Sequence, residues 1–330
     1  MTPSFSAAAE WTRRHVDAGR LPVAVLGIAD TKGVLHLEAF GTDQGRTAAV
    51  DDRFALYSVT KPLVALTAMR AVERGLLTVD TPLRDALPEF AHPQVALRHL
   101  VSHTSGIVDL VLGAPAHGGA TTLRDAVERA PLEFITGTAR RYNNLAWAGV
   151  TALIEHATGR DFEAEFAELT AAVGAAGLSF DTDDVHALHG GARYAHDPAD
   201  LLRLRHPAAG AAARATDLLA IGTSLLTDDG AVVSSATLTA MQRPLTDGLY
   251  IIDADPAKRF ENFGLGFNLP RRPGLIDHSV FGHAGWSGTQ FWVSPKTGVC
   301  VVLLTNRLDA TEPDVGVRFD ELQNTVFARA

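Results

Sequence analysis

The hydrophobic positions form short continuous runs near both ends of the chain. Val23–Ala29 and Val34–Phe40 are two such runs separated by a polar turn, which is typical of a β-hairpin. Thr289–Val293 and Val299–Thr305 repeat this arrangement near the C-terminus around a second turn. The pattern therefore predicts strands near both ends.

Apolar residues at helical spacing characterise the rest of the chain. An amphipathic helix is predicted over Ser4–Ala18, and a closing helix over Asp314–Arg329. Another helix is predicted after Ser58, where Pro62 suits a first turn and few charges follow. The middle of the chain contains further predicted helices over Leu97–Val101, Leu123–Arg129, Leu145–Thr158, Phe162–Thr170 and Ser235–Gln242.

This order of elements predicts an α+β protein. A hairpin alone is not a stable sheet, so we expect the strands of both ends to join in one antiparallel sheet of about five strands. The terminal helices would cover one face and the helical middle the other. We expect a discontinuous sheet domain of residues 1–60 and 276–330 and a mainly helical domain of residues 61–275, with an active site at their seam.

The composition narrows the class of protein. The chain has 330 residues, 46% hydrophobic and 20% charged, which is ordinary for a globular protein with a large core. A net charge of −9 and the lack of a basic stripe argue against a nucleic-acid partner. The single cysteine, Cys300, lies in an apolar run and is expected to be a packed thiol. No signal peptide or membrane-length apolar run is recognisable, so a cytoplasmic location is expected.

Ser58 and Lys61 form an S-x-x-K motif at the start of the apolar helix that follows. Residues three apart share one face of a helix, so the hydroxyl and the amine are expected to be neighbours. A serine needs a base to become a nucleophile, and a lysine can be that base when desolvation lowers its pKa. The alternative is a helix-capping serine beside a lysine whose amine reaches solvent.

Tyr142 and Asn144 precede the helix predicted from Leu145. A phenol can relay protons, and an amide can orient a substrate carbonyl. Capping and core packing are the alternative explanation.

Gly282–Gly288 is glycine-rich and lies beside a strand. Glycines let a ligand approach the backbone closely, and the N–H of Trp286 could pair with that of Ser58 as an oxyanion hole. A tight turn with a surface histidine is the alternative.

The histidines offer pairs such as His186 with His189 and His99 with His103, but no H-E-x-x-H motif is present. No nucleotide-binding glycine motif is present either. We therefore expect neither a metal nor another cofactor.

Together these motifs resemble those of the serine β-lactamase and penicillin-binding protein superfamily, and most closely class C β-lactamase-like hydrolases such as family VIII carboxylesterases and D-aminoacyl peptidases. Ser58 and Lys61 match the first motif, Tyr142 and Asn144 the Y-x-N motif, and His283–Gly285 the H-x-G form of the third. The resemblance also includes the turn Ser102–Gly106 and spans about residues 20 to 310. It implies a sheet with an inserted helical domain, the β-lactamase/transpeptidase-like fold.

The resemblance implies roles for these residues. Ser58 would be the nucleophile, Lys61 and Tyr142 would move protons, and the backbone N–H groups of Ser58 and Trp286 would hold an oxyanion. The predicted substrate-binding residues are Tyr57, Asn144, His283 and Gly285.

The implied reaction is hydrolysis of a small ester or amide through an acyl-enzyme. His283 stands where most β-lactamases have a lysine, which disfavours efficient hydrolysis of β-lactams. The same machinery would also serve a transacylase or a D-amino-acid amidase or peptidase. A sensor that is acylated by a β-lactam-like ligand and not turned over is the alternative outside enzymes.

Overall fold

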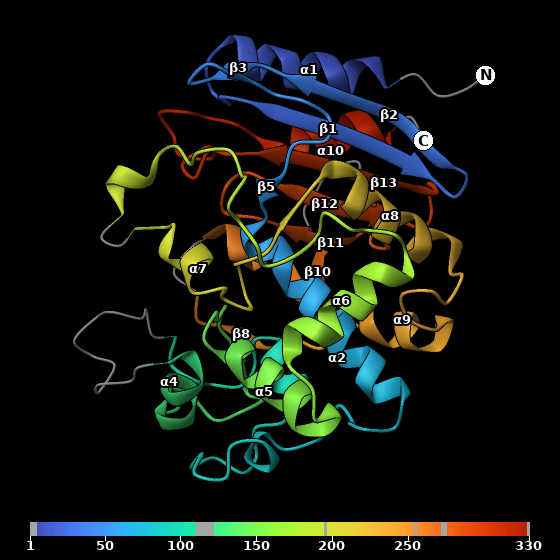
Figure 1. Ribbon diagram of the computed structural model, residues 1–330. Helices are drawn as coiled ribbons and strands as arrows, with labels where there is room; N and C mark the ends of the chain where they lie inside the picture. The colour runs from blue at the N-terminus through green and yellow to red at the C-terminus, as the bar shows by residue number, and fades with distance from the viewer. Residues whose placement is uncertain (1–4, 110–121, 195–196, 254–255, 272–275, 329–330) are drawn as a thin grey trace.

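The computed structural model describes residues 5–109, 122–194, 197–253, 256–271 and 276–328 (Figure 1). A seven-stranded antiparallel sheet with the order β2-β1-β13-β12-β11-β10-β9 is the largest sheet in this part of the chain. Its strands are β1 (Ala24–Asp30), β2 (Gly33–Phe40), β9 (Glu261–Phe263), β10 (Asn268–Pro270), β11 (Phe281–Ala284), β12 (Gln290–Ser294) and β13 (Val299–Thr305).

The two ends of the chain meet where β1 pairs with β13, from Ala24 opposite Thr305 to Asp30 opposite Val299. All seven residues of β13 are buried, because helices cover both faces of the sheet. Its Cys300 is one of these residues, and burial raises the pKa of the thiol to about 12. The strands predicted at both ends and their single antiparallel sheet are therefore confirmed.

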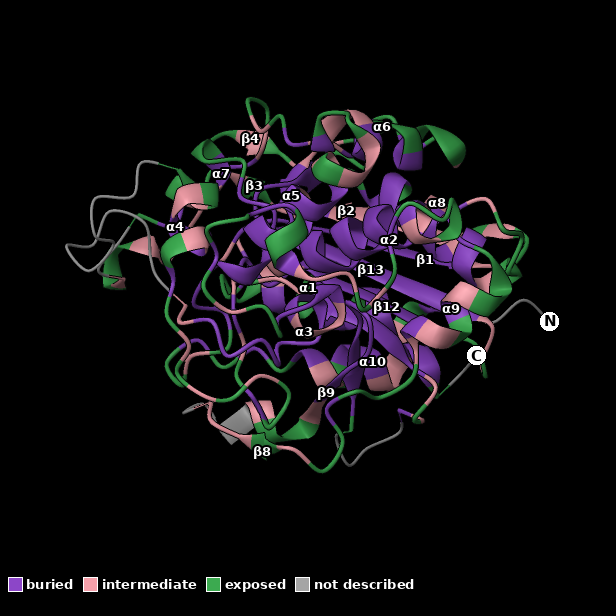
Figure 2. Cartoon of the chain, turned by 90° about the horizontal axis from the view of Figure 1, so that it is seen from below, coloured by how far each residue is buried: buried purple, intermediate pink, exposed green. Residues whose placement is uncertain are grey.

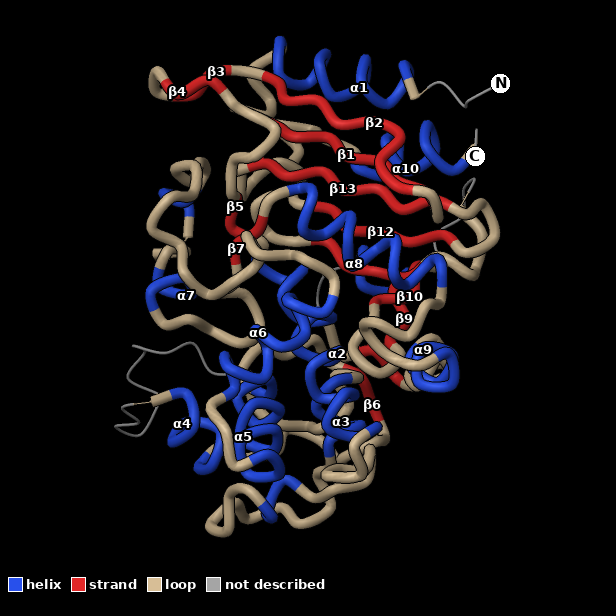
Figure 3. Tube along the Cα trace, turned by 45° about the vertical axis from the view of Figure 1, so that its right-hand side comes forward, coloured by secondary structure: helices blue, strands red, loops and turns tan. Residues whose placement is uncertain are grey.

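Successive residues of β13 enter two different hydrophobic clusters, as the alternation of side chains along a strand requires. Val302 and Leu304 join the cluster that contains α2 (Thr60–Glu73) and α8 (Ala215–Thr227). Val301 and Leu303 join the cluster that contains α1 (Ser6–Asp17) and α10 (Phe319–Phe327). Figure 3 shows α8 lying across one face, with the two terminal helices on the other.

The remaining helices lie mostly below the sheet in the view of Figure 1. They are α3 (Leu97–Val101), α4 (Leu123–Arg129), α5 (Ala146–Thr158), α6 (Phe162–Ala172), α7 (Asp200–Arg203) and α9 (Ser235–Met241). The described part also contains three two-stranded sheets. They pair β3 (Thr42–Asp43) with β4 (Arg46–Thr47), β5 (Phe54–Ala55) with β7 (Ala212–Ala213), and β6 (Ala139–Arg140) with β8 (Tyr250–Ile251).

The α+β class is confirmed, but the sheet has two more strands than the five or so expected. β9 and β10 have three residues each, too few to show an alternating pattern, and Pro270 ends β10. They place two strands of the sheet before residue 276, and the division into two domains at residues 60 and 276 stays a prediction. The closing helix begins at Phe319 rather than Asp314. Ser4 and Arg329, the outer ends of the predicted terminal helices, lie outside the described residues.

Helix α2 is central to the interior. Its residues from Thr60 to Met69 are all buried, and Figure 2 shows it among buried strands and helices. No helix in the described part of the chain has both the length and the apolar composition that crossing a bilayer requires. The cytoplasmic location stays a prediction.

Candidate active site

A strained turn presents Ser58 at the start of α2. Tyr57 has a φ of +46°, a conformation that costs a non-glycine residue about 1–3 kcal/mol unless packing holds it. Its buried side chain is held at two points: the hydroxyl donates to the carbonyl of Pro198 at 3.2 Å, and the ring lies edge-on to Trp286. Ser58 is consequently half-buried directly before the helix.

Lys61 lies one helical turn further on, with its side chain fully buried. Its Nζ is 3.1 Å from Ser58 Oγ, 2.8 Å from Asn144 Oδ1 and 3.1 Å from the carbonyl oxygen of Ala208. Burial lowers the pKa of Lys61 well below its usual value; the negative charge of Asp109 opposes this shift and the positive charge of Lys258 adds to it. A neutral amine can donate to Asn144 and Ala208 and keep its lone pair for the proton of Ser58.

Tyr142 approaches Ser58 from a different part of the chain. Its hydroxyl donates to Ser58 Oγ at 2.7 Å, and its ring stacks on His103 with the centroids 4.4 Å apart. Burial raises the pKa of Tyr142 well above its usual value, against a smaller opposite effect of the hydrogen bond to Ser58. A neutral phenol donating to Ser58 leaves the serine proton free to point at Lys61.

Asp109 fixes the orientation of Asn144. The carboxylate accepts from the N–H groups of Asn144 and Leu145, both at 2.9 Å, and from Asn144 Nδ2 at 3.1 Å. The amide nitrogen of Asn144 is thereby turned toward Asp109 and its oxygen toward Lys61. Burial raises the pKa of Asp109, against the opposing effect of these hydrogen bonds and of Lys61.

The turn after β11 packs directly on the segment before Ser58. Thr289 Oγ1 donates to the carbonyl of Leu56 at 3.0 Å, and Ser287 Oγ donates to that of Ala55 at 3.0 Å. A Cβ on Gly285 would collide with Leu56 O and Thr289 Oγ1, so only glycine allows this approach. The two segments expected to supply oxyanion donors, at Ser58 and Trp286, are therefore neighbours.

His283 lies on β11 and is buried rather than on the surface. Its Nδ1 lies 2.7 Å from the carbonyl oxygen of Ala284, which fixes the proton on Nδ1. Its Nε2 is buried without a hydrogen-bond partner in the described residues, and its ring centroid is 6.1 Å from that of Tyr142. Burial lowers the pKa of His283 well below its usual value. A neutral His283 therefore offers Nε2 as a free acceptor beside Tyr142.

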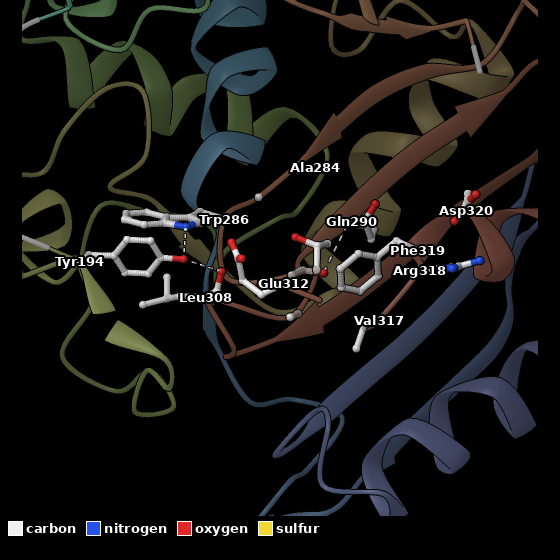
Figure 4. Close-up of a pocket in the computed structure, with 14 residues that line it drawn as sticks. Tyr194, Ala284, Trp286, Gln290, Leu308, Glu312, Val317, Arg318, Phe319 and Asp320 are labelled. Atoms are coloured by element: carbon white, nitrogen blue, oxygen red, sulfur yellow. Dashed lines mark hydrogen bonds between the residues drawn. The ribbon is translucent and has the colours of Figure 1, made fainter. Parts of the chain in front are cut away.

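A cavity of about 390 Å³ adjoins the same turn (Figure 4). Trp286 and Tyr194 form one wall, where Trp286 Nε1 donates to the Tyr194 hydroxyl at 3.3 Å. Leu308 and Phe319 line it from the segment after β13 and from α10. Ser58, Lys61 and Tyr142 are not among its lining residues, so the cavity adjoins the turn between β11 and β12 and does not surround Ser58.

The histidines of the pairs suggested by the sequence have other side chains as partners in the structure. His186 Nε2 lies 2.8 Å from Asp52, and His189 Nε2 lies 2.8 Å from Asp43. His103 stacks on Tyr142. No group of three or more potential metal ligands occurs within the described ranges.

The sequence motifs predict no role for three neighbours of Ser58, Lys61 and Tyr142. His103 is one of them, and the Ser102–Gly106 motif that contains it is the signal for its position. Asp109 and Lys258 carry no motif, and only the fold places them at the site.

The fold and the contacts of Ser58, Lys61 and Tyr142 define a class of proteins in which a serine stands at the start of a buried helix that packs against an antiparallel sheet. A comparison with protein families gives the particular family: the Beta-lactamase model matches residues 8–323. The chain therefore belongs to the β-lactamase family, which confirms the predicted superfamily.

Curated relatives include an esterase and acyltransferases. Esterase EstB of Burkholderia gladioli is 34% identical over 177 residues, which cover 46% of this chain and 45% of that protein. Monacolin J acid methylbutanoyltransferase of Aspergillus terreus is 28% identical over 194 residues, with 46% and 45% covered. The chain thus spans about half the length of the curated relatives it matches.

Solved structures match over almost the whole chain. EstCE1, described as a hydrolase with promiscuous acyltransferase activity, has a TM-score of 0.80 and 21% identity and covers 98% of both chains. A β-lactamase-like protein from Bacteroides dorei has a TM-score of 0.79 and 19% identity, with 99% of both chains covered. At these identities the likeness establishes the shared fold.

Proposed function

We propose that this protein is a serine hydrolase that cleaves a small ester or amide through an acyl-enzyme on Ser58. The observation that carries the proposal is the pair of contacts on Ser58 Oγ, 2.7 Å to Tyr142 and 3.1 Å to Lys61. A nucleophile with a neutral base on one side and a neutral acid on the other has both groups that acyl transfer needs.

The proposed acylation begins when Ser58 Oγ attacks the substrate carbonyl and its proton passes to the lone pair of Lys61 Nζ. The backbone N–H groups of Ser58 and Trp286 hold the oxyanion, an effect worth about 3–4 kcal/mol for each donor. Tyr142 gives its proton to the leaving group and regains one from Lys61. Water then attacks the Ser58 ester with the same groups and releases the acid.

Four further residues would shape the substrate site in this proposal. Asn144 orients the acyl group together with Lys61, and His283 offers Nε2 as an acceptor to the substrate. Tyr57 supports the turn that carries the nucleophile, and Gly285 lets the substrate lie against the backbone of β11. No metal or other cofactor takes part in these steps.

Acyl transfer to an alcohol or amine is the second candidate function. The names of relatives favour it, because one is a methylbutanoyltransferase and another is described as a hydrolase with promiscuous acyltransferase activity. The acyl-enzyme is the same, and only the acceptor of the acyl group differs. A D-amino-acid amidase or peptidase would likewise use an amide in place of an ester, and a sensor would stop at the acyl-enzyme.

The test is hydrolysis of p-nitrophenyl butyrate by the wild type and by Ser58→Ala. We expect steady turnover that falls by at least about 10³-fold in the variant. Ser234→Ala is a matched control, because Ser234 also begins a helix, as the cap of α9. Retained activity in Ser58→Ala would contradict the proposal.

Three further measurements separate the alternative functions. Ester products formed when an alcohol is added would favour the transacylase. A single burst with a stable adduct on Ser58, found by mass spectrometry, would favour the sensor. Turnover of a D-amino-acid amide and not of the ester would favour the amidase.

A further inference from the structure

Lys258 lies beside Tyr142, although the two residues are far apart in the sequence. Lys258 Nζ is 4.5 Å from the centroid of the Tyr142 ring, and Lys61 Nζ is 4.7 Å from the same centroid. An aromatic ring attracts a cation at such distances, and a charge on either amine opposes protonation of the other. Tyr142 thus has two lysine amines as neighbours, and only Lys61 belongs to a sequence motif.

A closed series of contacts holds Lys258 in this position. Its carbonyl oxygen accepts a hydrogen bond from Arg140 at 2.7 Å, and Arg140 lies 3.6 Å from Asp253. Asp253 accepts the backbone N–H of Tyr142 at 2.9 Å. The Lys258 amine also forms an ion pair with Glu261 at 3.1 Å. The backbone and the side chain of Lys258 are therefore both anchored around Tyr142.

These charges are shielded from water. The exposed fraction of the side chain is 25% for Lys258, 8% for Glu261 and 0% for Arg140. Charges in such an environment interact more strongly than pairs on an open surface, where solvent screens them. A change of charge at residue 258 or 261 is therefore felt at Tyr142 and Lys61.

Other ionisable groups contribute to the field around Tyr142 and Lys61. Two buried histidines face the ring, and acidic and basic groups approach from the neighbouring segments. These groups are Lys61 on α2, His103 after α3, Asp109 before α4, Arg140 on β6, Asp253 after β8, Glu261 on β9 and His283 on β11.

We propose that Lys258 is a positioning residue whose charge, balanced by Glu261, sets the pH above which Lys61 accepts the proton of Ser58. The proposal rests on the proposed function, in which the neutral amine of Lys61 is the active form. The third sequence motif carries His283 in place of the lysine of most β-lactamases, and the segment before β9 brings a lysine to the same tyrosine ring. Lys258 is also among the charges that lower the pKa of Lys61.

The sign of the effect follows from the charges. A positive charge near Lys61 opposes its protonation, so removing the charge of Lys258 raises the pKa of Lys61. The rise of kcat/KM with pH then moves to higher pH. Removing the negative charge of Glu261 leaves Lys258 unbalanced and moves the same rise to lower pH. A purely structural role predicts no such opposite shifts.

The experiment measures kcat/KM for p-nitrophenyl butyrate between pH 5 and 9 for the wild type, Lys258→Met, Lys258→Arg and Glu261→Gln. We call the rise of kcat/KM with pH the acidic limb. We expect its midpoint to move up by about one pH unit in Lys258→Met and down in Glu261→Gln. Lys258→Arg keeps the charge and should keep the limb of the wild type. Thermal midpoints identify any variant that is poorly folded.

Labelling of Ser58 by a fluorophosphonate, detected by mass spectrometry, distinguishes failure of the role of Lys258 from failure of the proposed function. Labelled and active Lys258→Met with an unmoved acidic limb would overturn the role of Lys258 and leave the proposed function standing. Limbs that move in the same direction in Lys258→Met and Glu261→Gln would also overturn it. A wild type that is neither labelled nor active would overturn the proposed function, and the role of Lys258 with it.

Discussion

The hydrogen bonds around Ser58 have a direction that follows from the environment of each partner. The raised pKa of Tyr142 keeps its buried phenol a donor, and the lowered pKa of Lys61 favours the neutral amine. With Lys61 in the neutral form, its lone pair accepts the proton of Ser58, which lies between the two groups. This arrangement favours Lys61 as the base and Tyr142 as the acid of the proposed reaction, without ionisation of the tyrosine.

Asp109 should matter to activity through Asn144. We expect Asp109→Ala to lower kcat/KM by more than about tenfold, because a misplacement near 1 Å at an active site has effects of this order and larger. The variant should also lose about 1 kcal/mol of stability, since Asp109 accepts the N–H groups of Asn144 and Leu145 directly before α5. Ester hydrolysis and chemical denaturation measure the two effects.

Asp161→Ala is the matched control for Asp109→Ala. Asp161 caps α6 by accepting the N–H of Glu163 at 2.9 Å. We expect a similar loss of stability and no change in kcat/KM. Equal losses of activity in the two variants would mean that Asp109 acts only by stabilising the backbone before α5.

Sequence spacing could predict contacts only within one turn of helix. Ser58 and Lys61 are three residues apart, and helix geometry alone makes them neighbours. Tyr142 is 84 residues from Ser58, so their contact was expected from the resemblance to a family and not from spacing. Asp109 and Lys258 belong to no motif, and their contacts depend on how distant segments pack.

At the scale of elements, the turn between β11 and β12 links the sheet to the start of α2. Gly285 is the point of closest approach, where a Cβ would meet Leu56 O and Thr289 Oγ1. Both neighbours are held, because Thr289 Oγ1 donates to Leu56 O at 3.0 Å. Even a small separation of the turn from the segment before Ser58 would therefore break this hydrogen bond.

Gly285→Ala should consequently impair catalysis. We expect kcat to fall by at least about tenfold, because displacement of the turn moves the N–H of Trp286, and one oxyanion donor is worth about 10²–10³ in rate. Gly298→Ala is the control, since Gly298 lies in open space at the other end of β12 with a φ of +70°. It should lose stability through backbone strain and keep kcat. Wild-type kcat in Gly285→Ala would contradict the predicted oxyanion hole.

The strands that the sequence predicted are the long ones. β1, β2, β12 and β13 have five to eight residues and clear apolar runs, whereas β9 and β10 have three residues each. Such short strands depend on pairing with a neighbour that is already in place, β11 in the case of β10. Local sequence carries little of that information, because the pairing is a property of the assembled sheet.

At the scale of the whole molecule, burial keeps several histidines neutral. It lowers the pKa of His99 to about 4 and that of His206 to about 3, and it also lowers those of His15, His103 and His283. In the unfolded chain a histidine has a pKa near 6.5. Below that pH the unfolded state binds protons that the folded state does not.

The free energy of unfolding should therefore fall as the pH decreases from about 6.5 toward 4. Each such histidine contributes a slope of up to about 1.4 kcal/mol per pH unit in this window and nothing above it. His206→Asn tests this, since an amide oxygen can replace Nδ1 as acceptor for the N–H of Ala208. Denaturant titrations at several pH values should give a slope smaller by about one proton in the variant. An unchanged slope would mean that His206 is protonated in the folded protein at the same pH as in the unfolded chain.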